Sequence, residues 1–187
     1  MKHFAANSQE TNRFTVDARV DERTLREIYL TNFEIAIKEG RPWSLMGAYN
    51  RLNGEHCCGN KWLLADVLRD DWGFDGIVIS DWSGVWDRVK SIEAGLDLQM
   101  PYCGDDYIKA VIEAVENGSL DEEVLDETVR RILKIANKAV AGRSVPVSCD
   151  YEAHHVLARR AAGESAVLLR NRGGVLPLAT GVKVALI

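Results

Sequence analysis

The sequence predicts an α/β fold built on parallel strands. Segments with helical spacing alternate with short apolar segments, which is the order expected of βα units. The run Ile77-Val78-Ile79 is β-branched throughout and lacks polar alternation, as expected for a strand covered on both faces. Asp81 follows that run closely. A carboxylate at the end of a buried strand needs hydrogen bonds, solvent or a chemical role.

The first half of the alternation begins with a helix. Residues 21–39 carry apolar side chains at helical spacing, with Asp21 as a candidate N-cap and Gly40 as a stop. A short strand is expected over 44–49. Residues 60–71 form the next predicted helix, which a following glycine closes.

The second half continues in the same order. We expect a strand over 77–80, a short helix over 84–94 and a strand over 95–101 that a proline ends. Two amphipathic helices follow over 105–117 and 121–140. This order places each predicted strand before a helix, as a parallel sheet requires.

The last part of the chain changes character. A linker is predicted over 143–152, followed by a helix over 152–163. Residues 165–170 and 182–187 have the composition of strands. Because the second of these ends at the final residue, the chain is expected to stop inside a structural unit.

Composition excludes several classes of partner. The 187 residues are 47% hydrophobic and carry a formal net charge of -5 without a basic stripe, so we expect neither nucleic acid nor membrane binding. Residues 1–20 lack a signal-peptide pattern, and no apolar run is long enough to span a bilayer. These features favour the cytoplasm but leave the compartment open. The four cysteines show no C-x-x-C spacing, and we predict no metal and no cofactor.

Functional groups in parallel sheets gather at the carboxyl ends of the strands. Arg13 lies in the long segment after the first such end, and Asp97 is expected to be structural. The other residues at these ends are Lys2, His3, Met46, Tyr49, Asp81 and Trp82. Cations that bind hydroxyls and aromatic faces that stack on a ring suit a polyhydroxylated ligand.

Six stretches carry a family resemblance. They are K-H-F-A-A-N-S-Q-E-T-N-R (2–13), A-Y-N-R-L-N-G (48–54), L-L-A-D-V-L-R-D-D-W-G-F-D-G (63–76), S-D-W (80–82), E-A-G-L-D-L-Q-M-P (93–101) and E-S-A-V-L-L-R-N-R-G-G-V-L-P-L (164–178). With these stretches in this order, the chain resembles glycoside hydrolase family three of the β-glucosidase and β-xylosidase type.

The resemblance implies an architecture. The family fold is a (β/α)8 (TIM) barrel followed by an α/β sandwich domain. Residues 1–142 would be the C-terminal part of the barrel, 143–152 the linker, and 153–187 the beginning of the second domain. The general acid/base of the β-glucosidase branch would be a glutamate beyond Ile187.

The resemblance also implies a site and a reaction. Asp81 matches the catalytic nucleophile, which would form a covalent glycosyl ester in a retaining hydrolysis of β-glucosides. The residues that match the sugar-binding positions are Lys2, His3, Arg13, Met46, Tyr49 and Trp82. The hexosaminidase branch is disfavoured because the chain has K-H-F-A-A-N-S where that branch has K-H-F-P-G-H-G.

Structural alternatives accompany these roles. Asp81 could cap a helix that begins near Val85. Trp82 and Met46 could fill the core, and Arg13 could be a surface ion-pair partner. His3 could be a packed or solvated terminal residue.

Functional alternatives also stay open. The chain could be an inactive truncated remnant or a weak sugar-binding fragment, and β-xylosides are an alternative substrate. We also predict self-association through open sheet edges.

Overall fold

The computed structural model describes residues 1–143 and 148–185. Contacts divide the chain into two units, which hold the described residues up to 143 and from 148 onward. The first unit combines helices with strands that pair mainly in parallel, so the predicted α/β class is confirmed. No helix in the two described ranges is both long and apolar enough to cross a membrane.

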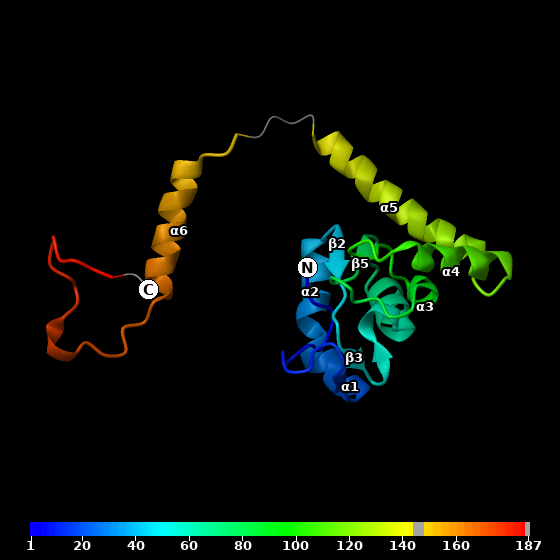
Figure 1. Cartoon of the computed structure of the whole chain (residues 1–187), viewed down its shortest axis with the longest axis horizontal. Coiled ribbons are helices and arrows are strands. Elements are labelled where there is room, and N and C mark those ends of the chain that lie inside the picture. Colours follow the sequence, from blue (N-terminus) through cyan, green and yellow to red (C-terminus); the bar gives the residue numbers. More distant parts are fainter. Residues whose placement is uncertain (144–147, 186–187) are drawn as a thin grey trace. The chain divides into compact units, whose positions relative to one another are not determined.

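A parallel sheet lies at the centre of the first unit. Strand β2 (Ser44–Met46) pairs in parallel with β5 (Ile77–Ile79), and Figure 1 shows the two side by side. Residues 1–4 extend the sheet beyond β2, where the Phe4 N–H donates to the Met46 carbonyl at 2.9 Å. Leu98 bridges to β5 on the opposite side. The spatial order of the four segments is therefore their order in the chain.

Two of the predicted strands are shorter than expected. The segment over 44–49 is a strand only as far as Met46, and 95–101 contributes one parallel bridge at Leu98. Residues 1–4 form a further extended segment, which pairs with β2.

The helix predicted over 21–39 is divided into three parts. They are α1 (Glu22–Thr24), the π-helical turn η1 (Leu25–Tyr29) and α2 (Thr31–Gly40). Asp21 is the N-cap as predicted, since its carboxylate accepts the Thr24 N–H at 3.0 Å. At the other end, Arg41 rather than a glycine takes the left-handed conformation, with φ of 44°.

The next two helices flank β5 in the sequence. The π-helical η3 (Trp62–Asp71) ends before Gly73, whose φ of 69° fits the glycine predicted to close it. Helix α3 (Arg88–Ala94) begins four residues later than the predicted start at 84. The reason is its cap, because the Asp87 carboxylate accepts the Lys90 N–H at 3.0 Å.

Helices α4 (Asp105–Glu116) and α5 (Glu122–Gly142) confirm the two amphipathic segments. Asp121 caps α5 by accepting the Glu123 N–H at 3.0 Å. Helix α5 contacts both α3 and β5, and it thereby covers one side of the sheet. Figure 1 shows α3, α4 and α5 in succession along this side of the unit.

A second, small sheet was not predicted. Strands β3 (Arg51–Leu52) and β4 (Glu55–His56) form a hairpin, and β3 pairs in parallel with β1 (Asp17–Ala18). Asn53 and Gly54 form its turn with φ of 52° and 98°, the signature of a two-residue hairpin turn.

The core lies between the central sheet and its helices. Val78 is fully buried, whereas its neighbours Ile77 and Ile79 are partly exposed on the opposite face. The predicted strand is therefore completely covered on one face only. The other fully buried large side chains include Phe4, Leu30, Leu45, Leu63, Leu64, Leu68 and Leu96.

The second unit has no buried residue among those described. It holds α6 (Tyr151–Ser165), which confirms the helix predicted over 152–163, and the short turn η4 (Arg172–Gly174). The strand predicted over 165–170 is wrong, and so is the described part of 182–187, because these residues are exposed and pair with no described strand. Residues 186–187 lie outside the described residues. The assignment of this unit to a second α/β domain stays a prediction.

Asp97 joins the sheet to two helices. Its side chain is fully buried, and it accepts hydrogen bonds from Arg69 of η3 at 2.7 Å and from Arg131 of α5 at 2.6 Å. It also accepts the Val78 N–H at 2.7 Å. Burial lowers the pKa of Arg69, and the Asp97 charge opposes that shift. This network of hydrogen bonds and ion pairs explains the structural role that the sequence predicts for Asp97.

We expect Asp97→Ala to lower the free energy of unfolding by about 3–5 kcal/mol, because two guanidinium groups lose a buried partner. Asp75→Ala is the matched control. Asp75 also pairs with α5, through Lys134 at 2.6 Å, but its side chain is 73% exposed, so the loss should stay below about 1 kcal/mol. Urea unfolding followed by tryptophan fluorescence measures the free energy of unfolding of both variants. Equal losses in the two variants would contradict the large stabilising contribution assigned to Asp97.

Candidate functional site

The strand that carries Asp81 is fixed at its carboxyl end by Ser80. The buried Ser80 hydroxyl donates to the Met100 carbonyl at 3.2 Å and accepts the Met100 N–H at 2.8 Å. The Ser80 N–H also donates to the Leu98 carbonyl at 2.9 Å. The Leu98–Met100 segment therefore fixes the backbone from which Asp81 leaves the sheet.

Three neighbouring strand ends supply partners to the Asp81 carboxylate. The Tyr49 hydroxyl donates to Oδ1 at 3.0 Å, and the Trp82 N–H donates to the same oxygen at 2.7 Å. The imidazole Nε2 of His3 lies 3.3 Å from Oδ2. These contacts fix the orientation of a carboxylate that keeps 15% of its surface exposed.

The helix-cap alternative for Asp81 is wrong. Helix α3 begins at Arg88, and its N-cap is Asp87. The Asp81 side chain accepts hydrogen bonds at the strand end instead, from Tyr49 and Trp82.

Tyr49 links the carboxylate to a second group of side chains. Burial raises the pKa of the Tyr49 hydroxyl, and the hydrogen bond to Asp81 adds to that shift. The Arg13 guanidinium lies 5.0 Å from the centre of the Tyr49 ring, and Phe14 packs 4.4 Å from it. Arg13 also forms an ion pair with Glu10 at 2.8 Å, which is the structural alternative expected for Arg13.

The other predicted site residues differ in how directly they meet Asp81. Trp82 is 52% exposed, which contradicts the core alternative for it. Lys2 is exposed beside His3, and Met46 is partly buried on β2. Within residues 1–143 and 148–185, no hydrogen bond or ion pair joins Lys2 or Met46 to Asp81, so their roles stay predictions.

His56 and Trp86 form an aromatic pair that the sequence reasoning missed. Their rings stack with centres 4.8 Å apart and planes 17° from parallel. The Arg51 Nε–H donates to His56 Nε2 at 3.1 Å, so Nδ1 carries the proton and donates to the Tyr49 carbonyl at 3.3 Å. Burial and nearby cations lower the pKa of His56. The Asn53-Gly54 dipeptide signalled the hairpin that positions this ring.

Cys57 and Cys58 lie behind the site. Both thiols are free and buried, and burial raises the pKa of each to about 12. Cys58 packs so closely on Gly47 that a Cβ there would lie 2.7 Å from its sulfur. Among the residues that the structure describes, no three His, Cys, Asp or Glu side chains are placed to hold a metal ion.

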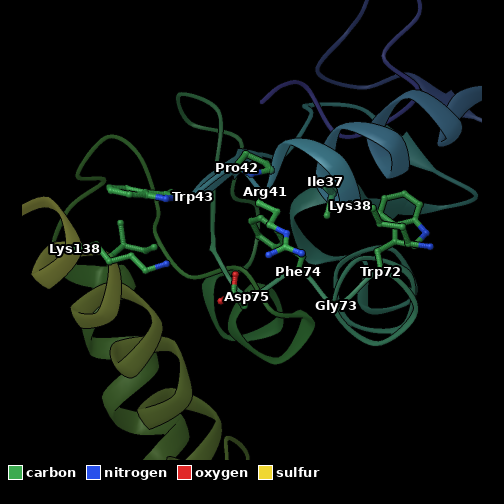
Figure 2. Close-up of a pocket in the computed structure, with 11 residues that line it drawn as sticks. Ile37, Lys38, Arg41, Pro42, Trp43, Trp72, Gly73, Phe74, Asp75 and Lys138 are labelled. Carbon is green, nitrogen blue, oxygen red and sulfur yellow. The ribbon is translucent and has the colours of Figure 1, made fainter. Parts of the chain in front are cut away.

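A cavity of about 540 Å³ lies at the amino end of the strands, away from Asp81. Figure 2 shows Arg41 and Asp75 in the middle of it, with Trp43 and Lys138 to one side and Trp72 to the other. The Lys138 ammonium lies 5.6 Å from the centre of the Trp43 ring. This contact joins α5 to the segment that leads into β2.

The chain matches known proteins along nearly its whole length. Residues 1–135 match the family model described as the Glycosyl hydrolase family 3 N terminal domain. Thermostable β-glucosidase B of Acetivibrio thermocellus is 52% identical over 187 residues, which are 100% of this chain and 25% of that protein. An exo-α-(1→6)-L-arabinopyranosidase of Bifidobacterium longum is 47% identical over 97% of this chain and 24% of its own length.

A solved structure shows the same arrangement. Thermotoga neapolitana β-glucosidase 3B in complex with glucose superposes with a TM-score of 0.83 and 48% identity, over 95% of this chain and 26% of that one. The chain thus spans about a quarter of the length of these relatives.

We expect the stability of the first unit to fall as pH drops below 6.5, the ordinary pKa of histidine, and on through the lowered pKa of His56. The unfolded chain binds the proton first, so protonation favours unfolding in this window. His56→Gln should flatten this part of the profile, whereas His155→Gln, which changes an exposed residue of the second unit, should not. Urea midpoints from pH 5 to 8, followed by tryptophan fluorescence, test this. Identical slopes in all three proteins would contradict it.

Proposed function

This chain belongs to glycosyl hydrolase family 3, and from that premise we propose that it supplies the nucleophile and part of the sugar-binding site of a retaining β-glucosidase. The observation that carries the proposal is the Asp81 carboxylate, which Tyr49, His3 and the Trp82 N–H hold at the carboxyl end of β5. The glucose bound by the Thermotoga relative supports a sugar as ligand.

The proposed reaction has two steps. An Asp81 oxygen attacks the anomeric carbon, the bond from that carbon to the leaving oxygen breaks, and a glycosyl ester forms. Water then cleaves the ester and restores the configuration. Lys2, His3 and Arg13 would bind sugar hydroxyls, while Met46, Tyr49 and Trp82 would line the same subsite.

The leaving oxygen requires a proton from a second carboxyl group, about 5–5.5 Å from the first in retaining enzymes. Within the described residues, no second carboxylate contacts Asp81 or its partners Tyr49 and Trp82. The proposal therefore assigns the acid to the second domain, beyond Ile187, as the family resemblance implies. Activity is proposed for a protein that contains both parts.

The strand order supports a barrel as the setting. Residues 1–4, β2, β5 and Leu98 lie in chain order, with helices between them, as in a (β/α)8 barrel. We place residues 1–142 in the later part of such a barrel, and 153–187 at the beginning of an α/β sandwich domain after the linker 143–152.

A second candidate activity is α-L-arabinopyranoside hydrolysis. The arabinopyranosidase of Bifidobacterium longum is 47% identical to this chain, against 52% for the β-glucosidase of Acetivibrio thermocellus. Hydrolysis rates with p-nitrophenyl β-glucoside, β-xyloside and α-L-arabinopyranoside discriminate the three sugars. A site that binds sugar but cleaves none of them would support the sugar-binding alternative.

We expect Asp81→Asn to abolish turnover in a hybrid where this chain replaces the aligned quarter of the Acetivibrio β-glucosidase. The loss of kcat should exceed the ~10²–10⁴-fold typical of a general acid or base, because no covalent ester can form. A 2-deoxy-2-fluoro-glucoside should label Asp81, which peptide mass mapping detects. Asp75→Asn is the control and should stay active. Near-normal turnover in folded Asp81→Asn, or a label on Asp97, would refute the assignment.

We expect Tyr49→Phe in the same hybrid to lower kcat by roughly 10–100-fold while leaving the fold intact. The change deletes one charge-assisted hydrogen bond to Asp81 and keeps the ring that packs against Phe14. Steady-state kinetics with p-nitrophenyl β-glucoside measure the effect. Tyr29→Phe is the matched control, and an equal loss there would show that the hydroxyl of Tyr49 has no special role.

A further inference from the structure

The cavity of about 540 Å³ at the amino end of the strands takes no part in the proposed reaction. Trp43 directly precedes β2, and Asp75 lies two residues before β5, so the chain enters the sheet along one wall of this cavity. The last turn of α2 and the C-terminal half of α5 supply further walls. Its volume is within the range of small-molecule sites.

Two charged side chains of the cavity already have partners of opposite charge. Asp75 pairs with Lys134 at 2.6 Å, and Lys38 pairs with Glu34 at 2.5 Å. Neither Lys134 nor Glu34 lines the cavity. Because each pair is neutral as a unit, Asp75 and Lys38 together add little net charge to the cavity.

Arg41 and Lys138 carry the positive charge that remains. Both line the cavity, and within residues 1–143 and 148–185 neither side chain forms a hydrogen bond or an ion pair. The Lys138 ammonium lies 5.6 Å from the centre of the Trp43 ring, a contact that leaves its charge without an acidic partner. The C-terminal ends of α2 and α5 carry roughly half a negative charge each, which offsets only part of the charge of the two side chains. The cavity therefore attracts an anion, although the formal net charge of the chain is -5.

Arg41 also occupies a position at which glycine is the usual residue. It ends α2 in the left-handed conformation, with φ of 44° and ψ of 55°. A residue with a Cβ adopts this conformation only at a cost, and helices commonly end with glycine there. Figure 2 shows the Arg41 side chain in the middle of the cavity. A costly backbone conformation that places a guanidinium in a cavity is typical of a ligand-binding residue.

We propose that this cavity binds a phosphate group, either inorganic phosphate or the phosphate of a small sugar ester, and that Arg41 is its principal ligand. The planar guanidinium donates two parallel N–H groups to two oxygens of one phosphate. Lys138 adds a second positive charge, which suits a group that carries about −1.5 to −2 charges at pH 7 better than a singly charged carboxylate. The half-exposed Trp43 contacts the carbon atoms of an ester. This function lies beyond the proposed hydrolysis and requires no part of the Asp81 site.

The test is a titration of the 187-residue chain with sodium phosphate at constant ionic strength, followed by NMR. The reporters are the Trp43 indole N–H and the backbone amide of Asp75, and we expect saturable shifts at both. Arg41→Gly should raise the dissociation constant at least about tenfold, and Lys138→Gln should raise it about two- to fivefold. Lys109→Gln is the matched control and should have no effect, because it removes one positive charge outside the cavity.

Arg41→Gly also separates binding from stability. Glycine adopts the left-handed conformation freely, so this variant should keep or raise the urea midpoint of the first unit while it loses affinity for phosphate. If its circular dichroism spectrum changes, Arg41→Asn takes its place with the same expected loss of affinity, because asparagine tolerates the same backbone conformation.

Titrations with glucose 6-phosphate and acetate identify the anion. Tighter binding of glucose 6-phosphate than of inorganic phosphate would assign the site to a sugar ester, and equal or weaker binding would assign it to free phosphate, so both results support the proposal. Absence of saturable shifts, unchanged affinity in folded Arg41→Gly, an equal loss in Lys109→Gln, or acetate binding as tight as that of phosphate would overturn it.

Discussion

The buried Asp97 carboxylate is the constraint on which the first unit depends. A fully buried charge is costly unless opposite charges and hydrogen bonds surround it, and Arg69 and Arg131 meet this need from two different helices. The same carboxylate also accepts the N–H of Val78, in the middle of the strand that leads to Asp81. A single side chain thus fixes η3 and α5 against β5, and with them the position from which Asp81 leaves the sheet.

The ends of several neighbouring strands, and not a single element, supply the residues of the candidate site. His3 belongs to the first extended segment, Tyr49 follows β2, and Asp81 follows β5, so the parallel register brings the three together. His56 extends this arrangement by holding the Tyr49 carbonyl. The conformation of the hairpin over 51–56 is therefore coupled to the carboxylate through Tyr49, although the hairpin itself does not contact Asp81.

Much of this was accessible from the sequence where periodicity and caps agreed. The structure confirms three predictions that depend on local signals. They are the N-cap at Asp21 and the helices over 105–117 and 121–140. The start of α3 was misplaced because Asp81 and Asp87 are both plausible caps, and only tertiary contacts assign the first to the site. The strands predicted near the end failed because strand composition forms no strand without a neighbour. The pairing of His56 with Trp86 required knowledge of the hairpin.

The two buried cysteines allow the opening of the first unit to be measured by thiol alkylation. Cys57 and Cys58 are inaccessible and stay protonated at neutral pH, whereas Cys103 is partly exposed and Cys149 is exposed. An alkylating reagent therefore meets two reactive sulfurs in the folded chain and four in the unfolded chain. Cys58 packs against Gly47, directly before the loop that carries Tyr49. Its alkylation rate therefore reports how often the backbone next to Tyr49 and Asp81 opens.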